Sequence, residues 1–484
     1  MASTPKADES SAAPSVSAPV PLGLKITHGF GSSALGIKEG GFNYFLLLFY
    51  GTVVGLEPGL VGLSILIALI FDAITDPIVG YWSDNFRSRL GRRHPFMYAS
   101  AIPVGLSYFL LWNPPDWSQM GLFFYLTFLA ITIRTFITFY ETPSSSLLPE
   151  LTSDYEERTS LQSFRLFFAW ISGNLMSVLL FGVLLAGPLG MQDRSGFETY
   201  GIIASCVIFA AIIVSSAATH HRIPTLSKPS KSAEPFSIRR VTREMFEILS
   251  ERSFIALFIA TVVFSIALGL NTSLAFLMLR HFWGFSEEQI FLWTTTVFLS
   301  AGMALVLTPI VGKRMGKKKA TLLIGFFAFT IQPAPYLLRL AGLMPENGDP
   351  MLFPLMLSIN IIDLSLIIAV QMLSYAMIAD LVESNQLRTG RRNEGVYYAA
   401  MTFTRKSTQG LGVLSAGIIL SAIAFPQGEE LANIPADTLW KLGALYAPAL
   451  LILWMTALFC LSRYKIDKAQ HEANLAALSE RSPT

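Results

Sequence analysis

The sequence predicts an all-α polytopic membrane protein with 12 transmembrane helices arranged as two six-helix bundles. Of its 484 residues, 52% are hydrophobic and only 14% are charged, whereas about a quarter of the residues in soluble domains are charged. The apolar segments are continuous runs, which favours helices over the alternating strands of outer-membrane barrels. Six such runs, a polar segment and six further runs follow one another along the chain.

The elements follow in order from this hydropathy pattern. The first 24 residues are rich in Ser, Ala and Pro and have no apolar run of signal-peptide length, so they are expected to form a disordered cytoplasmic tail. The predicted divisions are the tail 1–24, an N-terminal bundle 25–218, a cytoplasmic linker 219–252, a C-terminal bundle 253–462 and a cytoplasmic tail 463–484. The predicted spans are 26–54, 59–82, 95–113, 120–141, 162–187, 199–218, 253–280, 287–312, 319–341, 351–380, 395–424 and 438–462.

Loop charges predict the orientation in the membrane. Lys and Arg are concentrated in the loops after the second, eighth and tenth spans, around Arg92, Lys318 and Arg391. The loops after the odd-numbered spans contain more acidic residues. Because basic loops stay in the cytoplasm, both termini and the linker are expected there, in a cell (inner) membrane protein. The net charge of +2 gives no indication of nucleic acid, and Cys206 and Cys460, which both sit in apolar runs, indicate neither a disulfide framework nor a metal site.

A short internal repeat relates the two halves. Pro77-Ile78-Val79-Gly80 and Pro309-Ile310-Val311-Gly312 lie 309 − 77 = 232 residues apart, each at the cytoplasmic end of the second span of its half. Two six-helix halves related by a repeat are typical of the major facilitator fold, in which the substrate site lies between the halves near the membrane midplane. We therefore expect that fold.

Two carboxylates stand where a membrane span should be apolar. Asp72 and Asp76 are four residues apart in the second span, so both project from one helix face. Each ionised acid costs about 2.5–3.5 kcal/mol at the bilayer centre on insertion scales. A bound cation or proton would relieve this cost, and hard cations such as Na⁺ prefer oxygen ligands. The alternative is that the pair ends the helix and braces the following basic loop.

The fourth span carries a polar stripe. Arg134, Thr138 and Glu141 fall on one helix face, which must point to the bundle interior because lipid offers these groups no partner. Thr138 and Glu141 could complete an oxygen cage with the two aspartates of the second span. The alternative is a structural Arg134–Glu141 interaction, although about 10 Å of helix rise separates the two residues.

Two further spans contain buried polar candidates. Lys406 lies near the middle of the eleventh span, where it could balance the acids until a cation enters. The alternative is that Lys406 or the adjacent Arg405 extends to the membrane interface. In the first span, Glu39 and Asn43 are one turn apart and offer the donors and acceptors that suit a sugar-like ligand. Their alternative is an interfacial Lys38–Glu39 cluster.

Charges at cytoplasmic helix ends suggest a gate. Asp84, Arg92 and Arg93 follow the second span, and their charges could pair with neighbouring helix ends in one conformation only. The corresponding candidates after the tenth span are Asp380, Arg392 and Glu394. A simple topology signal is the alternative, and both roles can coexist.

Three blocks of sequence together resemble a known family. They are FDAITDPIVGYWSDNFRSRLGRRHPF, ETPSSSLLPELTSDYEERTSLQSFR and MIADLVESNQLRTGRRNEG. In this order and at these spans, they resemble the glycoside-pentoside-hexuronide:cation symporter family, in particular its melibiose permease-like members, over roughly residues 25–462.

The resemblance implies roles for individual residues. Asp72, Asp76 and Thr138 match the family's cation site, and Glu141 stands where the family has an aspartate. Lys406 matches the buried lysine of its eleventh helix, and Arg165 falls at or beside a fifth-helix arginine linked to sugar binding. The sugar-reading aspartate of the first helix aligns near Gly36 and is therefore missing, which argues against galactoside specificity.

The function expected from these features is cation-coupled symport of a glycoside or similar solute by alternating access. Thr138 adds a neutral oxygen that a metal ion uses and a proton does not need, so Na⁺ is favoured over H⁺. A cation-dependent lysophospholipid transporter on the same fold is the alternative. No zinc-protease or Walker motif indicates an enzyme. We expect no cofactor, no metal other than the transported cation, and a monomer in the lipid bilayer.

Overall fold

The structure, a computed structural model, describes residues 20–152, 154–187, 189–225, 252–389, 394–426, 434–465, 470 and 473. Within these ranges the description leaves out the side chains of 149, 155–156, 159, 225, 252–253, 378–379, 382–386, 388–389, 394–403 and 405–407. Residues 1–19 of the predicted N-terminal tail, most of the linker and most of the C-terminal tail lie outside the described residues.

The N-terminal bundle contains the six predicted crossings. Its first crossing is a broken helix, in which π-helical segments interrupt regular α-helix, and it begins at Leu22, inside the stretch expected to be tail. The elements are α1 (Leu22–Phe30), α2 (Ser33–Gly40), η1 (Gly41–Phe45), α3 (Leu46–Leu48), η2 (Phe49–Val54), α4 (Pro58–Asn85), α5 (His94–Leu111), α6 (Gln119–Ser146), α7 (Leu148–Leu151), α8 (Tyr155–Leu179), η3 (Leu180–Leu184), η4 (Gly190–Gln192), α9 (Arg194–His220) and η5 (Ile223–Thr225).

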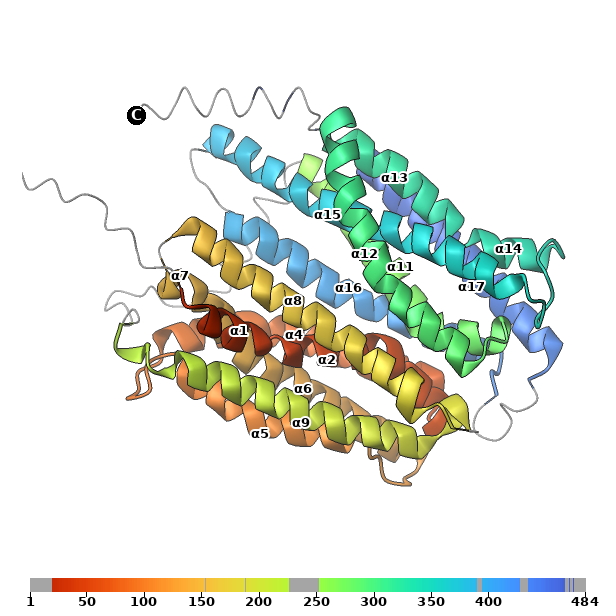
Figure 1. Ribbon diagram of the computed structural model, residues 1–484, viewed down its shortest axis with the longest axis horizontal. Coiled ribbons are helices and arrows are strands. Elements are labelled where there is room, and N and C mark those ends of the chain that lie inside the picture. Colours follow the sequence, from red (N-terminus) through yellow and green to blue (C-terminus); the bar gives the residue numbers. More distant parts are fainter. Residues whose placement is uncertain are drawn as a thin grey trace, which may run out of the picture.

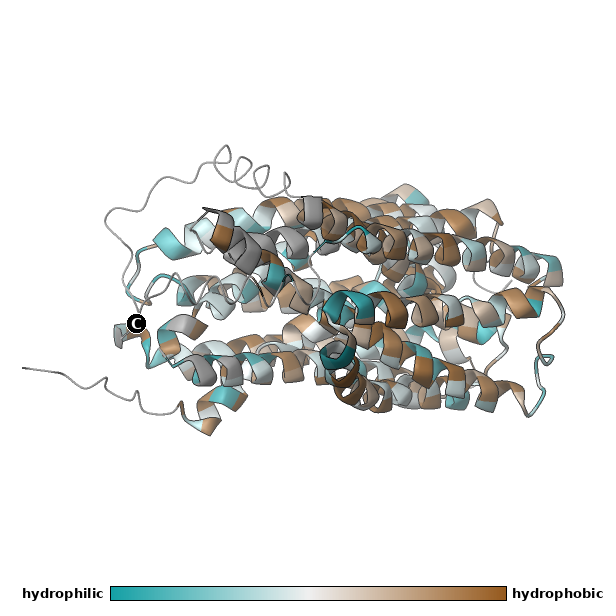
Figure 2. Ribbon diagram, turned by 90° about the horizontal axis from the view of Figure 1, so that it is seen from above, coloured by the Kyte–Doolittle hydropathy of each residue, from teal (hydrophilic) through white to brown (hydrophobic). Residues whose placement is uncertain are grey.

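The C-terminal bundle contains the other six crossings. Its elements are α11 (Arg252–Leu277), η6 (Met278–Phe282), α12 (Glu287–Met315), α13 (Lys317–Ile331), α14 (Ala334–Leu340), α15 (Leu352–Thr389), α16 (Glu394–Ala422) and α17 (Ala436–Ser462). Among the described residues, nine helices are long and apolar enough to cross a membrane. The prediction of 12 helical crossings in two bundles is confirmed, and Figure 2 shows hydrophilic residues gathered mainly toward loops and helix ends.

The helix starts follow from local chemistry. Glu57 caps α4 by accepting from the backbone N–H groups of Gly59 at 3.2 Å and Leu60 at 3.1 Å, and Pro58 supplies a fixed φ at the first helical position. Ser286 and Gln289 form a reciprocal capping box at the start of α12. These caps set where two of the long spans begin.

The internal repeat is visible in how the helices pack. Gly80 of α4 faces Thr142 of α6, and the equivalent Gly312 of α12 faces Leu373 of α15, so both glycines meet the fourth helix of their own bundle. Glycines also mediate the crossing of the first and fifth helices in each bundle. In the C-terminal bundle these are Gly269 and Gly412, where a Cβ would meet backbone atoms of the other helix.

The two bundles meet toward the end of the molecule that the charge pattern places outside the cell. Phe276 of α11 packs its ring against Phe181 of η3 at a centroid distance of 4.2 Å and against Phe45 of η1 at 5.7 Å. At the start of α4, the backbone N–H of Gly59 and the carboxylate of Glu57 both bond the hydroxyl of Ser421 on α16. Figure 1 shows the N-terminal bundle below and the C-terminal bundle above, and α16 of the C-terminal bundle packs against α4.

Candidate cation and solute site

One hydroxyl connects the two aspartates of α4. Thr138 of α6 places its Oγ1 2.7 Å from Asp76 Oδ1 and 3.1 Å from Asp72 Oδ1. Asp72 and Thr138 are each 2% exposed, so the group lies inside the bundle. A hydroxyl donates only one hydrogen bond at a time, and its lone pairs remain available to a cation. Side chains from α4 and α6 therefore form an oxygen cluster of two carboxylates and a hydroxyl.

An arginine on the same stripe neutralises one of the carboxylates. Arg134 Nη1 lies 3.3 Å from Asp72 Oδ2, and both side chains are almost completely buried. The guanidinium also lies over the ring of Phe42, 4.9 Å from its centroid. Breaking a buried ion pair by removing one partner costs about 3–5 kcal/mol. Arg134 is thus placed to act as the counter-charge of Asp72 when no cation is bound.

Glu141 takes a different partner from the one expected of a cage ligand. Its Oε1 accepts from Arg165 Nη2 of α8 at 2.9 Å, and Arg165 Nε donates to Ser32 Oγ at 3.2 Å. In the described part of the chain, no three His, Cys, Asp or Glu side chains come together as metal ligands. The structural Arg134–Glu141 interaction is also not formed, because each residue binds a different partner. Glu141 Oε2 is buried and has no hydrogen-bond partner among the described residues.

The first crossing explains why the family's aspartate is missing at Gly36. A Cβ at Gly36 would lie 1.8 Å from the carbonyl oxygen of Ala169, because α2 and α8 touch there. A side chain at this position is therefore excluded by sterics. Next to this contact, Ser172 Oγ donates to Ser33 Oγ at 2.7 Å.

The polar groups of the first crossing lie one turn further along. Lys38 forms an ion pair with Glu39, and Glu39 Oε2 also accepts from Asn43 Nδ2 at 3.1 Å. Lys38 is 1% exposed and sits halfway along the crossing, so an interfacial Lys38–Glu39 cluster is not what the structure shows. The structure therefore brings Glu39 and Asn43 into hydrogen-bond contact, and the buried Lys38 forms an ion pair with Glu39.

Some expected site residues lie outside the described residues. The side chain of Lys406 on α16 is among them, as are Arg392 and the side chain of Glu394. Their predicted roles stay predictions.

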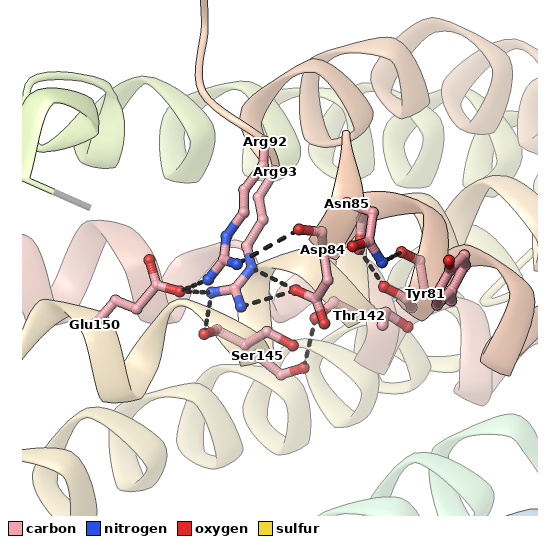
Figure 3. Close-up of polar contacts among 11 residues, drawn as sticks. Tyr81, Asp84, Asn85, Arg92, Arg93, Thr142, Ser145 and Glu150 are labelled. Carbon is pink, nitrogen blue, oxygen red and sulfur yellow. Dashed lines mark hydrogen bonds and ion pairs between the residues drawn. The ribbon is translucent and has the colours of Figure 1, made fainter. Parts of the chain in front are cut away.

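The charges of the N-terminal bundle that are predicted to be cytoplasmic form one cluster, shown in Figure 3. Arg93 Nη2 pairs with Asp84 Oδ1 at 2.9 Å, and Arg93 Nη1 lies 2.8 Å from Glu150 Oε1. Arg92 pairs with the same Glu150 carboxylate and donates to the Asp84 carbonyl at 3.4 Å. The cluster joins the start of α5 to the end of α4 and to α7, which follows α6, all within one bundle.

The C-terminal bundle repeats this arrangement. Lys317, at the start of α13, pairs with Asp380 near the end of α15 and donates to the Ala376 carbonyl at 3.4 Å. Asp380 is 3% exposed. In both bundles, then, a base before the third span holds an acid near the end of the fourth. The partners described for Asp84, Arg92, Arg93 and Asp380 all lie within the same bundle as the residue itself.

Several of these residues are not candidates on sequence reasoning alone. The sequence pattern places Lys38 only in an interfacial cluster, and it does not assign Glu150 and Lys317 as partners of the gate charges. A signal for them exists, since Lys38 is charged and central in an apolar span, and Glu150 follows shortly after the fourth span. Asp363 of α15, an acid in the middle of an apolar run, is a further residue of this kind.

Comparison with known proteins assigns the family. Residues 27–468 match the family described as MFS/sugar transport protein. The chain belongs to the glycoside-pentoside-hexuronide:cation symporter family of the major facilitator superfamily. It is therefore a multi-pass membrane transporter and not an enzyme, and as a member of this symporter family it couples solute to a cation.

Relatives cover almost the whole chain at low identity. The sequence is 27% identical to an uncharacterized symporter of Synechocystis sp., over 92% of this chain and 94% of that protein. It is 24% identical to the isoprimeverose transporter of Lactiplantibacillus pentosus, over 93% and 90%. It is 23% identical to the sodium-dependent lysophosphatidylcholine symporter 1 of Gallus gallus, over 90% and 85%.

Solved structures confirm the predicted fold. A mutant of the nucleoside transporter NupG superposes with a TM-score of 0.63 at 12% identity, and the match covers 91% of this chain and 99% of that one. The D-xylose-proton symporter gives a TM-score of 0.56 at 13% identity, over 89% and 97%. The architecture is the major facilitator fold.

Proposed function

We propose that this symporter carries Na⁺ together with a glycoside or related sugar-like solute across the cell (inner) membrane by alternating access. The observation that carries the proposal is the hydroxyl of Thr138 between the carboxylates of Asp72 and Asp76. These are three oxygen ligands of the kind that hard cations prefer. A proton would need only one carboxylate, so the shared neutral oxygen favours Na⁺ over H⁺.

Coupling would follow from a change of ion-pair partners. In the structure, Arg134 pairs with Asp72. Na⁺ entering between the aspartates competes with Arg134 for the Asp72 oxygens, because both are cations. The released guanidinium can then turn to a solute oxygen in the substrate site expected between the two halves of this fold. Cation and solute would thus favour each other's binding, and such coupling is reciprocal.

The solute side of the site would use polar groups from two helices. Glu39 and Asn43 lie on the first crossing, and Arg165 lies on α8, where it holds Glu141. Carboxylate, amide and guanidinium groups can recognise the hydroxyls and ring oxygens of a sugar by hydrogen bonding to them. Lys406 is proposed as a further coupling residue, by resemblance only. The proposed cytoplasmic gate consists of Asp84, Arg92, Arg93, Asp380, Arg392 and Glu394.

The alternative solute is a lysophospholipid. The 23% identity to a sodium-dependent lysophosphatidylcholine symporter over most of both chains favours it. The isoprimeverose transporter is equally distant, at 24%. The two hypotheses share the cation site and differ only in the solute.

Reconstituted protein distinguishes the alternatives. Liposomes with an inward Na⁺ gradient should accumulate a labelled glycoside, and uptake should collapse when the gradient is dissipated. Accumulation of a labelled lysophospholipid, with no glycoside transported, would support the alternative solute. The proposed coupling to Na⁺ would be wrong if uptake followed only a pH gradient.

Both termini are proposed to be cytoplasmic. Impermeant thiol reagents applied outside should therefore not label single cysteines placed near Arg92 or Lys318.

A further inference from the structure

An acid that belongs to none of the sites above lies in the middle of the C-terminal bundle. Asp363 is the twelfth residue of α15, so about 16 Å of helix separates it from the outer end of a bilayer core about 30 Å thick. It is 6% exposed. Its Oδ1 is buried and has no hydrogen-bond partner among the described residues, where no ion pair to Asp363 occurs either. An ionised carboxylate in this position would be costly.

The neighbours of Asp363 on α14 and α17 are uncharged. They are two buried tyrosines, Tyr336 and Tyr446, and a neutral phenol supplies no positive charge to balance a carboxylate. The Tyr446 hydroxyl donates its single proton to Asn271 Oδ1 of α11 at 2.7 Å, so that proton is not available to Asp363. A protonated carboxyl needs no counter-charge in such surroundings, whereas a carboxylate does.

The other helices packed around α15 bring no compensating charge in the described residues. Between Gln289 and Gly312, α12 has no titratable side chain, and the lysines of α13 sit at its cytoplasmic end. On α16, Arg405 and Lys406 are charged, and their side chains lie outside the described residues. The described residues of these helices thus place no positive charge beside Asp363.

The cluster is joined to the part of the protein that must move. Asn271 lies on α11, and five residues further along the same helix Phe276 packs on Phe45 and Phe181 of the N-terminal bundle. Figure 1 shows α14, α15 and α17 together in the C-terminal bundle, with α11 among them. Separation of the bundles at their outer end would break the Phe276 contacts of α11, the helix that also holds Tyr446 through Asn271.

We propose that Asp363 is a proton-binding site of the transport cycle, separate from the carboxylates of the N-terminal bundle. The proton is bound in the conformation described here and is exchanged when the outer contacts of α11 open. This inference adds a second cation, a proton, to the proposed function. The transport experiment below rests on that proposed function, whereas the spectroscopic experiment does not.

Infrared spectroscopy of the purified full-length protein in lipid nanodiscs tests the bound proton directly. At neutral pH, the carbonyl stretch of a buried protonated carboxyl should be present in the wild type and lost in Asp363→Asn. It should shift, not vanish, in Asp363→Glu, which gives a second measurement if the first variant folds poorly. Asp349→Asn, at an exposed acid just before α15, is the matched control and should leave the band unchanged. A band that persists unchanged in Asp363→Asn would overturn the proposal.

Transport provides the second measurement. At saturating Na⁺, the pH dependence of solute uptake should be lost in Asp363→Asn and kept in Asp363→Glu and Asp349→Asn, while the Na⁺ dependence stays unchanged. A wild-type pH response in Asp363→Asn would refute the role in the cycle. Absence of cation-driven uptake in the wild type would instead count against the proposed function, and the infrared result would still decide whether Asp363 binds a proton.

Discussion

At the scale of single residues, the central feature is that Asp72 and Asp76 share one hydroxyl but differ in charge environment. Asp72 is almost fully buried and paired with Arg134, whereas Asp76 is partly buried and accepts from Thr138. The two acids should therefore respond differently to substitution. Asp72 would hold Arg134 in place, and Asp76 would provide charge for the cation.

Asp76→Asn should abolish Na⁺-driven uptake without unfolding the protein. The substitution keeps the shape and an oxygen that can accept from Thr138, but removes the negative charge that attracts the ion. Uptake into liposomes under a Na⁺ gradient measures the effect, and thermal unfolding checks the fold. The matched control is Asp116→Asn, an exposed loop acid. Wild-type accumulation by Asp76→Asn would contradict the cation site.

Thr138→Val should raise the Na⁺ concentration needed for half-maximal uptake by about tenfold, which corresponds to about 1.4 kcal/mol of lost ion binding. Valine has the same shape but no oxygen for the ion. Thr138→Ser keeps the hydroxyl and should restore most of the Na⁺ response. If the valine variant shows an unaltered Na⁺ dependence, Thr138 is not an ion ligand.

At the scale of elements, hydropathy predicts all 12 crossings, because an apolar run of bilayer length has few alternatives. Most helix ends agree within five residues, but α8 begins at Tyr155 instead of 162 and α15 continues to Thr389 instead of 380, because polar turns extend both helices beyond their apolar runs.

The pairing of charges is harder to predict, since it depends on how each helix is rotated against its neighbours. Spacing places Arg134, Thr138 and Glu141 on one stripe but cannot show that Arg134 meets α4 while Glu141 meets α8. The π-helical segments of the first crossing have no evident sequence signal.

Gly36→Ala tests the close crossing of α2 and α8. The added methyl would lie 1.8 Å from the Ala169 carbonyl oxygen, so the helices must separate, at a cost of about 1–3 kcal/mol typical of overpacking. The control is Gly40→Ala on the same helix, where the nearest atom of α8 would be 3.6 Å away. The thermal midpoint of unfolding should fall for Gly36→Ala and change little for Gly40→Ala. Equal effects of the two substitutions would show that the crossing is not as close as described.

At the scale of the whole molecule, the contacts between bundles described above lie at the end that the loop charges predict to be outside the cell, and with that orientation the conformation is closed toward the outside. Glu57 of the N-terminal bundle and Ser421 of the C-terminal bundle bond to each other there, and the rings of Phe45 and Phe276 also join the two bundles. The cytoplasmic clusters around Arg93 and Lys317 stay within their own bundles. Sequence reasoning predicts the two bundles and the gate residues but not which end is closed, because both conformations satisfy the same hydropathy pattern.

Ser421→Ala should shift the protein toward the conformation open to the outside, because it removes the partner of Glu57 and Gly59 on the opposite bundle. Spin labels at positions 116 and 349, on exposed outer loops of the two bundles, report their separation. Longer distances should gain population in the variant. The control Ser415→Ala removes a hydroxyl of α16 that donates to Leu411 of its own helix, and it should leave the distribution unchanged. An unchanged distribution in Ser421→Ala would mean that this contact does not hold the outer end closed.

The central claim is that a Na⁺ site between α4 and α6 controls solute binding. The most direct test is the affinity of the purified protein for a labelled solute at increasing Na⁺ and fixed pH. We predict that affinity rises with Na⁺ until the site is filled, and that Asp76→Asn removes this rise, because coupling between two sites is reciprocal. Solute affinity that ignores Na⁺ over a wide concentration range and follows pH alone would contradict the claim.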